Sequence, residues 1–133
     1  MKLTARSEYA LLAMLYLARN RSKGAISVAA IAEAELISPK FLEHILLALK
    51  RAGYVQSSKG QHGGFHLAKQ PDRISLAEII RVLDGALAPT ESVSKYFYES
   101  TPIEKEKGLV SVFKNIRDYV SKKLEETTLA DLV

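Results

Sequence analysis

The chain has 133 residues, of which 47% are hydrophobic and 26% charged, and this composition predicts one compact domain with an appended helix. It contains no cysteine, which excludes disulfides, Cys-ligated zinc, thiolate-held iron–sulfur clusters and cysteine nucleophiles. Residues 1–70 carry ten Lys/Arg against four Asp/Glu, whereas residues 71–133 carry nine against eleven. The basic first half indicates a surface for a polyanion, although an ordinary charge asymmetry would look the same.

The first predicted helix covers residues 5–20 and is apolar on all sides from Tyr9 to Ala18. This run of ten residues is too short to span a bilayer. Arg6 and Glu8 stand where a signal peptide would become apolar. We therefore expect a buried helix in a cytoplasmic protein that has no membrane partner.

Two capped helices follow, separated by a tight turn. Ser27 predicts the N-cap of a short helix that ends at Glu35. Ser38 caps the next helix with Pro39 at its first position, and Gly53 supplies a left-handed stop. The inward stripe of this third helix is Phe41, Leu42, Ile45, Leu46 and Leu49.

A hairpin is predicted directly after the third helix, with strands near 54–58 and 65–68 around the loop Lys59-Gly60-Gln61-His62-Gly63-Gly64. A phosphate-binding loop of nucleotide hydrolases would need Lys and Ser/Thr after the glycines and then a helix. Here Lys59 precedes the glycines and a strand follows, so that interpretation fails. A capped helix with a hairpin beside it indicates a winged helix-turn-helix, and the fold class is mainly α with a small β-hairpin wing.

The outward side of the third helix and the hairpin tip form the candidate DNA-binding site. The N-terminal part of the second helix of a helix-turn-helix approaches base edges in the major groove, where Glu43 can accept from cytosine and His44 can donate to a purine. The wing tip can reach the minor groove or flanking phosphates. For each residue taken singly, a solvated surface position remains an open alternative. The predicted DNA-binding residues are Ser38, Pro39, Lys40, Glu43, His44, Lys50, Lys59, Gly60, Gln61 and His62.

Ser75 to Glu78 form a capping box that starts a fourth helix, which closes near Gly85. Residues 86–101 show little periodicity and contain the aromatic triplet Tyr96, Phe97 and Tyr98. This triplet is a candidate site for a small-molecule or partner-protein effector, and ordinary core packing is an equally open interpretation.

Thr101 to Glu104 form a second capping box, which predicts a helix of about 25 residues that ends at Glu126. Apolar residues recur along it at steps of three and four. So long an amphipathic helix beside a small domain needs a cover, and the simplest cover is its copy in a second chain. The predicted dimerisation residues are Leu109, Val112, Phe113, Ile116, Tyr119, Val120 and Leu124.

No catalytic or metal-binding constellation is recognisable in the sequence. His62 and His66 are four residues apart, but no suitable third ligand lies near them. Scattered carboxylates such as Glu33 and Glu35 show no acid/base pairing. We therefore expect a binding protein with no catalytic residues, no metal ligands and no cofactor.

Three segments closely resemble the Rrf-two family of bacterial winged-helix transcription regulators: 38–44, 49–55 and 58–67. The beginning of the chain and residues 127–132 are also similar to that family. Its members include the iron–sulfur cluster regulator, the nitric-oxide-sensitive repressor and the cysteine-metabolism repressor. The resemblance implies a homodimer, joined through the long C-terminal helix, that binds an imperfect palindrome in promoter DNA.

Two departures from the family pattern stand out. Many members hold an iron–sulfur cluster with three cysteines between the fourth helix and the dimer helix, whereas Ala86 to Gly108 contain none. Glu8 aligns with a carboxylate ligand of some relatives, but an acid that favours the helix N-terminus is the stronger interpretation. Leu36 stands where such turns often carry Gly, so we expect a slightly different turn geometry.

These observations divide the chain into a winged helix-turn-helix over 1–85, a connecting and effector segment over 86–101, and a dimerisation helix with a tail over 102–133. The predicted function is a sequence-specific, DNA-binding transcriptional regulator, a repressor, that acts on double-stranded DNA as a homodimer without a cysteine-ligated cluster. The competing function is a winged-helix module for protein–protein interaction with no role at DNA. Nothing supports an enzyme.

Overall fold

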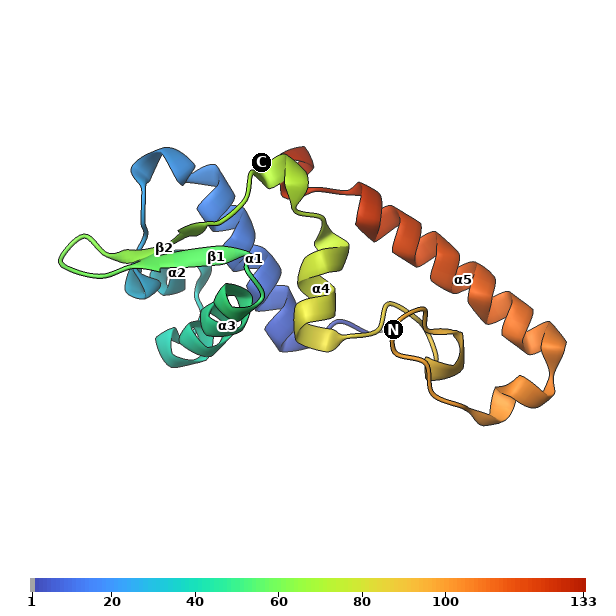
Figure 1. Ribbon diagram of the computed structural model, residues 1–133. Helices are drawn as coiled ribbons and strands as arrows, with labels where there is room; N and C mark the ends of the chain where they lie inside the picture. The colour runs from blue at the N-terminus through green and yellow to red at the C-terminus, as the bar shows by residue number, and fades with distance from the viewer. Residues whose placement is uncertain (1) are drawn as a thin grey trace.

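Five helices and one hairpin make up the computed structural model, which describes residues 2–133 (Figure 1). The helices are α1 (Ala5–Arg19), α2 (Val28–Glu35), α3 (Pro39–Arg51), α4 (Leu76–Asp84) and α5 (Lys107–Glu126), and the strands are β1 (Val55–Ser58) and β2 (Gly64–Leu67). The predicted class, mainly α with a small β-hairpin wing, is confirmed. Helices α1 to α4 and the hairpin form a head, and α5 extends from it as an arm.

Three serines are the N-caps of α2, α3 and α4, as the sequence predicts. Ser27 Oγ accepts from the Ala30 amide at 3.1 Å and Ser38 Oγ accepts from the Phe41 amide at 3.4 Å. Ser75 and Glu78 form the complete capping box, with each side chain accepting from the other's backbone amide. These bonds satisfy amides that have no partner inside the helix.

The hairpin is antiparallel, with Val55 opposite Leu67 and Ser58 opposite Gly64. A third short segment joins it, because Ile26 and Phe65 exchange two backbone hydrogen bonds of 2.9 and 2.8 Å. A Cβ atom on Gly64 would lie only 2.2 Å from the Ile26 carbonyl oxygen. The backbones can therefore approach this closely only because residue 64 is glycine.

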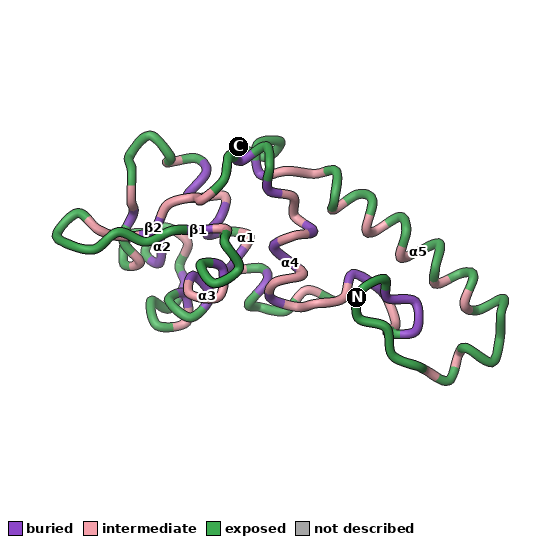
Figure 2. The backbone as a smooth tube through the Cα atoms, viewed as in Figure 1, coloured by how far each residue is buried: buried purple, intermediate pink, exposed green. Residues whose placement is uncertain are grey.

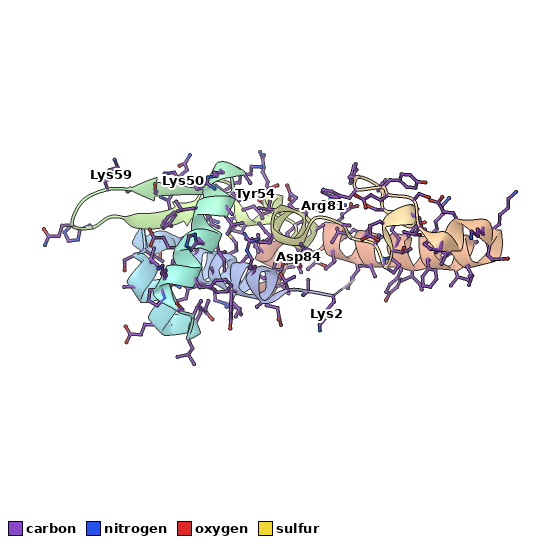
Figure 3. The ribbon with its side chains drawn as sticks, turned by 90° about the horizontal axis from the view of Figure 1, so that it is seen from below. Lys2, Lys50, Tyr54, Lys59, Arg81 and Asp84 are labelled. Atoms are coloured by element: carbon purple, nitrogen blue, oxygen red, sulfur yellow. The ribbon has the colours of Figure 1, made fainter. Side chains whose placement is uncertain are left out.

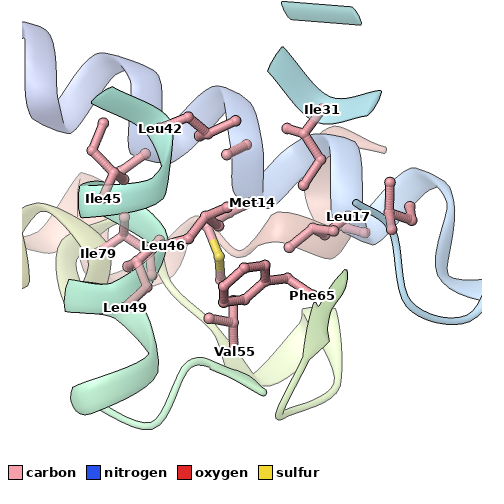
Figure 4. Packing of buried hydrophobic residues seen from close by; sticks show 14 of the residues in the cluster. Met14, Leu17, Ile31, Leu42, Ile45, Leu46, Leu49, Val55, Phe65 and Ile79 are labelled. Carbon is pink, nitrogen blue, oxygen red and sulfur yellow. The ribbon is translucent and has the colours of Figure 1, made fainter. Parts of the chain in front are cut away.

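The core of the head lies where α1, α3 and the hairpin meet (Figure 4). Met14, Leu42 and Leu46 are completely buried there. The C-terminal tail returns to this core, because Leu129 is also completely buried and its amide donates to the Ile74 carbonyl at 3.0 Å. Figure 2 shows the contrast with α5, which is exposed or half-buried along its whole length.

The predicted start of the last helix is wrong. The segment Pro102–Lys105 forms a short 3₁₀ turn, and α5 begins only at Lys107. The Thr101 hydroxyl donates to Ser92 Oγ at 2.6 Å and does not cap the backbone, while Glu104 accepts from Tyr98 and Ser100. The capping-box residues are thus used to fold the preceding segment.

Leu36 forms the turn between α2 and α3 in the left-handed conformation, at φ 56° and ψ 47°. Leu36 thus takes a conformation that is more usual for glycine, and the expected departure from the family's turn geometry stays a prediction. A leucine in this region is strained because its Cβ crowds the following carbonyl.

Within residues 2–133, every helix is too short or too polar to cross a membrane.

Candidate nucleic-acid interface

Helix α3 and the hairpin loop place all ten predicted DNA-binding residues on the surface, each of them exposed. The inward stripe of α3 explains this arrangement, because Leu42, Ile45 and Leu46 are completely buried and turn the opposite side of the helix outward. The two elements are adjacent in the chain and in space, so their exposed residues belong to one side of the head (Figure 3).

The N-cap and the first two turns of α3 present Ser38, Lys40, Glu43 and His44 to solvent. Backbone amides at the start of a helix carry partial positive charge and favour a phosphate oxygen. Among residues 2–133, Glu43 has no ion-pair partner. Its carboxylate therefore forms no competing ion pair within this part of the chain.

Lys50 lies at the other end of α3, about 18 Å from Ser38 by the helical rise per residue. Its ammonium group donates to Ser57 Oγ on β1 at 2.7 Å. The structure therefore places Lys50 beside the hairpin and away from the N-terminal residues of α3, as Figure 3 shows for Lys50 and Lys59.

The hairpin loop closes through a bond from the Gly63 amide to the Gly60 carbonyl at 3.0 Å. A Cβ on residue 63 would lie 2.4 Å from the Ser58 carbonyl oxygen, so this tight closure requires glycine. The loop leaves Lys59, Gln61 and His62 exposed at its tip. One positive charge and two further polar side chains are thus presented beyond the end of the strands.

The outer face of the hairpin adds residues that the sequence analysis did not select. Gln56 and Ser57 are exposed, and they border a cavity of about 440 Å³ between β1 and the end of α3. His66 borders it too, with its Nε2 3.1 Å from Gln56 Oε1. Strand alternation could have identified Gln56, because the neighbouring Val55 is the buried residue.

Tyr54 fixes the hairpin relative to α4. Its hydroxyl donates to Glu78 Oε1 at 3.1 Å, and the Lys69 ammonium lies 4.6 Å from the centre of its ring. Burial and the neighbouring Glu78 carboxylate raise the pKa of Tyr54 above its usual value, while Arg81 opposes the shift. The hydroxyl therefore stays protonated as the donor of this bond at neutral pH.

Helix α5 divides the seven predicted dimerisation residues into two groups. Phe113, Val120 and Leu124 are half-buried within their own chain, and Leu124 packs against the α4 residues Ala77 and Ile80. The other group is exposed by 43 to 77% and consists of Leu109, Val112, Ile116 and Tyr119.

The chain is similar to known proteins along nearly its whole length. A family model named Rrf2, described as an iron-dependent transcriptional regulator, matches residues 3–133. The chain belongs to the Rrf2 family. This is the family that the motifs of α3 and the hairpin resemble, and the chain is a winged-helix transcriptional regulator.

Individual Rrf2 relatives match over nearly the whole chain. The HTH-type transcriptional regulator CymR of Bacillus subtilis is 35% identical over 132 residues, covering 99% of this chain and 89% of CymR. The solved structure of CymR, the global cysteine regulator of B. subtilis, matches with a TM-score of 0.81 at 33% identity, over 99% of this chain and 95% of that one. T. potens IscR matches with a TM-score of 0.77 at 30% identity, over 99% and 85%.

The residues of this Rrf2 chain do not fit an iron–sulfur cluster. The sequence contains no cysteine to supply thiolates. Among residues 2–133, the carboxylates and histidines form no group of three that could hold a metal ion. Glu8 is exposed in the first turn of α1, where its charge favours the helix N-terminus.

The aromatic triplet does not belong to the core. Tyr96, Phe97 and Tyr98 are 66, 47 and 59% exposed, so the interpretation as ordinary core is wrong. The Arg81 guanidinium lies 5.1 Å from the centre of the Tyr96 ring, and the Tyr98 hydroxyl donates to Glu104 at 2.6 Å. That hydrogen bond raises the pKa of Tyr98. The triplet is thus an exposed surface held in place by polar contacts.

Proposed function

We propose that this Rrf2 protein is a repressor that binds palindromic promoter DNA as a homodimer, with α3 in the major groove and the hairpin tip at the minor groove or its phosphates. The observation that carries this proposal is the exposed side of α3 beside the exposed loop. Its three lysines face only one carboxylate among the ten residues, which suits the charge of the phosphate backbone.

The roles of individual residues follow from their positions. Lys40, Lys50 and Lys59 contact phosphates, which sets affinity and orientation. Glu43 and His44 lie on the first turns of α3 and read base edges. The backbone around Gly60 lets the loop approach the duplex closely.

Binding of the protein to promoter DNA of its own gene tests the proposal, by footprinting at moderate salt. We expect protection of a dyad site. Lys59→Ala should weaken binding to all sequences and lower the slope of log affinity against log salt by about one unit. Glu43→Gln should change the preferred bases and leave the salt slope unaltered.

Lys105→Ala is the matched control, because Lys105 is an exposed lysine far from the hairpin. A Lys59→Ala variant with the same salt slope as this control would refute the role of the hairpin tip. A stable complex with another protein, together with no salt-sensitive DNA affinity, would support the protein–protein interaction module in place of DNA binding.

The second copy of the chain covers the exposed group on α5, Leu109, Val112, Ile116 and Tyr119. These four residues recur at steps of three and four and so share one face of the helix, and the two-fold symmetry of a dimer matches that of a palindrome. Ile116→Asp should convert the protein to a monomer in light-scattering measurements and weaken binding to the full palindrome by at least about tenfold. A wild-type protein that is monomeric at micromolar concentration would overturn this assignment.

Regulation by this chain does not use a cysteine-ligated cluster, because the donor set for it is missing. DNA affinity measured with and without an iron chelator should agree within about twofold, a difference of less than 0.5 kcal/mol. A tenfold loss on chelation would contradict the proposal.

The effector-sensing part of the chain is the segment 86–101. Its exposed aromatics suit a partner protein or a flat ligand that packs on an open surface, because aromatic side chains dominate such contacts. The double variant Tyr96→Ala/Phe97→Ala should leave the DNA affinity of the purified protein unchanged. In cells, it should abolish the change in transcription from the regulated promoter that the effector causes. A promoter response equal to that of the wild type would refute this role.

A further inference from the structure

A cavity of about 730 Å³ lies on the back of β2, between the end of α1 and the turn Pro71–Arg73. We call it the basic cavity and define it by Arg21, Gly24, Ser58, Ala68 and Arg73. Its volume falls within the range of pockets that bind small molecules. The segment after α1 and the turn before α4 both contribute lining residues.

Positive charge dominates the lining. Arg21, Lys69 and Arg73 border the basic cavity, and no Asp or Glu lies among the residues that line it. Within residues 2–133, neither arginine forms an ion pair. Two guanidinium groups therefore border one cavity, with ten N–H donors in total.

The floor of the cavity has a different character from its rims. Leu17, Ala25 and Leu67 supply apolar surface, while Ser58, His66 and Gln70 supply further hydrogen-bonding groups. An apolar floor with a few convergent polar groups is typical of a site for a small molecule. Guanidinium groups recognise phosphate and carboxylate through paired hydrogen bonds.

The arginines of the basic cavity come from segments other than α3, although the cavity shares His66 and Ala68 with the cavity beside Lys50. In Figure 1, α3 lies below the hairpin, whereas the segment after α1 and the turn before α4 lie above it. Figure 3, seen from below, places α3 in front and agrees with this arrangement. Arg21 and Arg73 therefore belong to segments that are separate from α3 and from the hairpin loop.

We propose that the basic cavity binds a small anionic ligand, whose phosphate or carboxylate group is held between Arg21 and Arg73. The ligand would rest on Leu17 and Leu67 and contact the back of β2. This assignment is independent of the proposed function, because it concerns ligand binding in the absence of DNA.

Titration of the full-length protein with ADP and with citrate, followed by the NMR shifts of backbone amides, tests the site. ADP represents the phosphate source, citrate represents the carboxylate source, and adenosine is the uncharged control. We expect at least one of the two anions to shift the amides of Gly24, Ala68 and Lys69 in a saturable way, and adenosine to bind much more weakly. The anion that saturates identifies the source.

Two charge-matched double variants sharpen the test. Arg21→Gln with Arg73→Gln should weaken binding by at least about tenfold. Lys105→Gln with Lys107→Gln removes the same charge from an exposed position outside the cavity and should bind as the wild type does. The single substitutions Arg21→Gln and Arg73→Gln should each give part of the loss.

Three results would overturn the proposal. The first is the absence of saturable shifts with either anion. The second is an equal loss of binding in both double variants, which would indicate a diffuse effect of net charge. The third is a lower salt slope for operator DNA in the ligand-free Arg21→Gln/Arg73→Gln protein, which would assign these arginines to the DNA backbone.

Discussion

The head and α5 obtain their stability in different ways. The head buries a continuous set of apolar side chains, among them Met14, Leu42 and Leu46, at 0% exposure. Helix α5 has 20 residues and none of them is buried. The head therefore carries its own core, while α5 depends on contacts with α4 and with the segment before it, and leaves an apolar group for the second copy proposed above.

Paired substitutions of apolar residues give the largest test of this difference. Leu46→Ala removes a completely buried side chain and should lower the free energy of unfolding by about 2 to 5 kcal/mol. Ile116→Ala removes a side chain that is 43% exposed and should cost about 1 kcal/mol or less in the dilute monomer. Urea unfolding measures both, and equal losses would show that α5 has a core of its own.

Paired glycine substitutions come next in size. Gly64→Ala places a Cβ 2.2 Å from the Ile26 carbonyl, so it should destabilise the head by about 2 to 3 kcal/mol. Gly108→Ala lies in the first turn of α5 with open space around its Cβ, and it should stabilise the helix by about 0.5 to 1 kcal/mol. Thermal unfolding distinguishes the two, and a neutral Gly64→Ala would contradict the close approach of the backbones.

Asp84 joins α4 to the start of α1 by accepting from the backbone amide and the hydroxyl of Thr4. Burial alone would raise its pKa, but bonds from Thr4 and Ser7 and the nearby Arg6 charge hold the pKa below its ordinary value. Asp84→Asn should therefore lower the free energy of unfolding by about 1 kcal/mol at neutral pH. This loss is smaller than for a buried charged hydrogen bond, because solvent screens the Asp84 carboxylate.

The pH dependence of that cost has a definite sign. Because the pKa is lowered in the folded state, the contribution of Asp84 is present above its unfolded pKa and is lost as the pH falls through the folded pKa. The stability difference between wild type and Asp84→Asn should vanish in acid. Asp118→Asn on α5 is the control, because its 65% exposed carboxylate pairs only with the adjacent Arg117 and should contribute little at any pH.

The smallest expected effect concerns Leu36, which is 90% exposed. Leu36→Gly relieves the left-handed strain of roughly 1 to 2 kcal/mol but adds backbone entropy to the unfolded chain worth roughly 0.5 to 1 kcal/mol. We expect a net gain of roughly 0 to 1.5 kcal/mol in thermal unfolding. A clear loss of stability would show that the leucine side chain makes a contact in solution.

Local signals explain what the sequence could predict. Ser27, Ser38 and Ser75 cap helices through bonds to residues three positions away, so a short pattern contains the whole interaction. The stripe of α3 also lies within one element, which is why its exposed side could be assigned in advance. The exposed positions of the ten candidate DNA-binding residues agree with that assignment, and their contacts with DNA stay a prediction.

Long-range contacts explain what the sequence could not predict. Thr101 carries a capping pattern, but its hydroxyl bonds to Ser92, which only the folded segment brings near. The stripe of α5 mixes residues that pack on α4, such as Leu124, with residues that face outward, such as Tyr119. The burial of Leu129 gives no periodic signal, because its 3₁₀ turn has only four residues.

The return of the C-terminal tail to the head has a consequence for the promoters that this regulator can occupy. Thr127 accepts from the Leu76 amide at 2.9 Å and Leu129 is enclosed by the core, so α5 ends in a firm attachment and not in a loose tether. Two such subunits would hold their heads at one separation and one rotation about the duplex. One base pair inserted between the half-sites rotates one half-site relative to the other by about 35° around the DNA axis. We expect that single insertion to abolish tight binding, even though every base that the protein reads is still present.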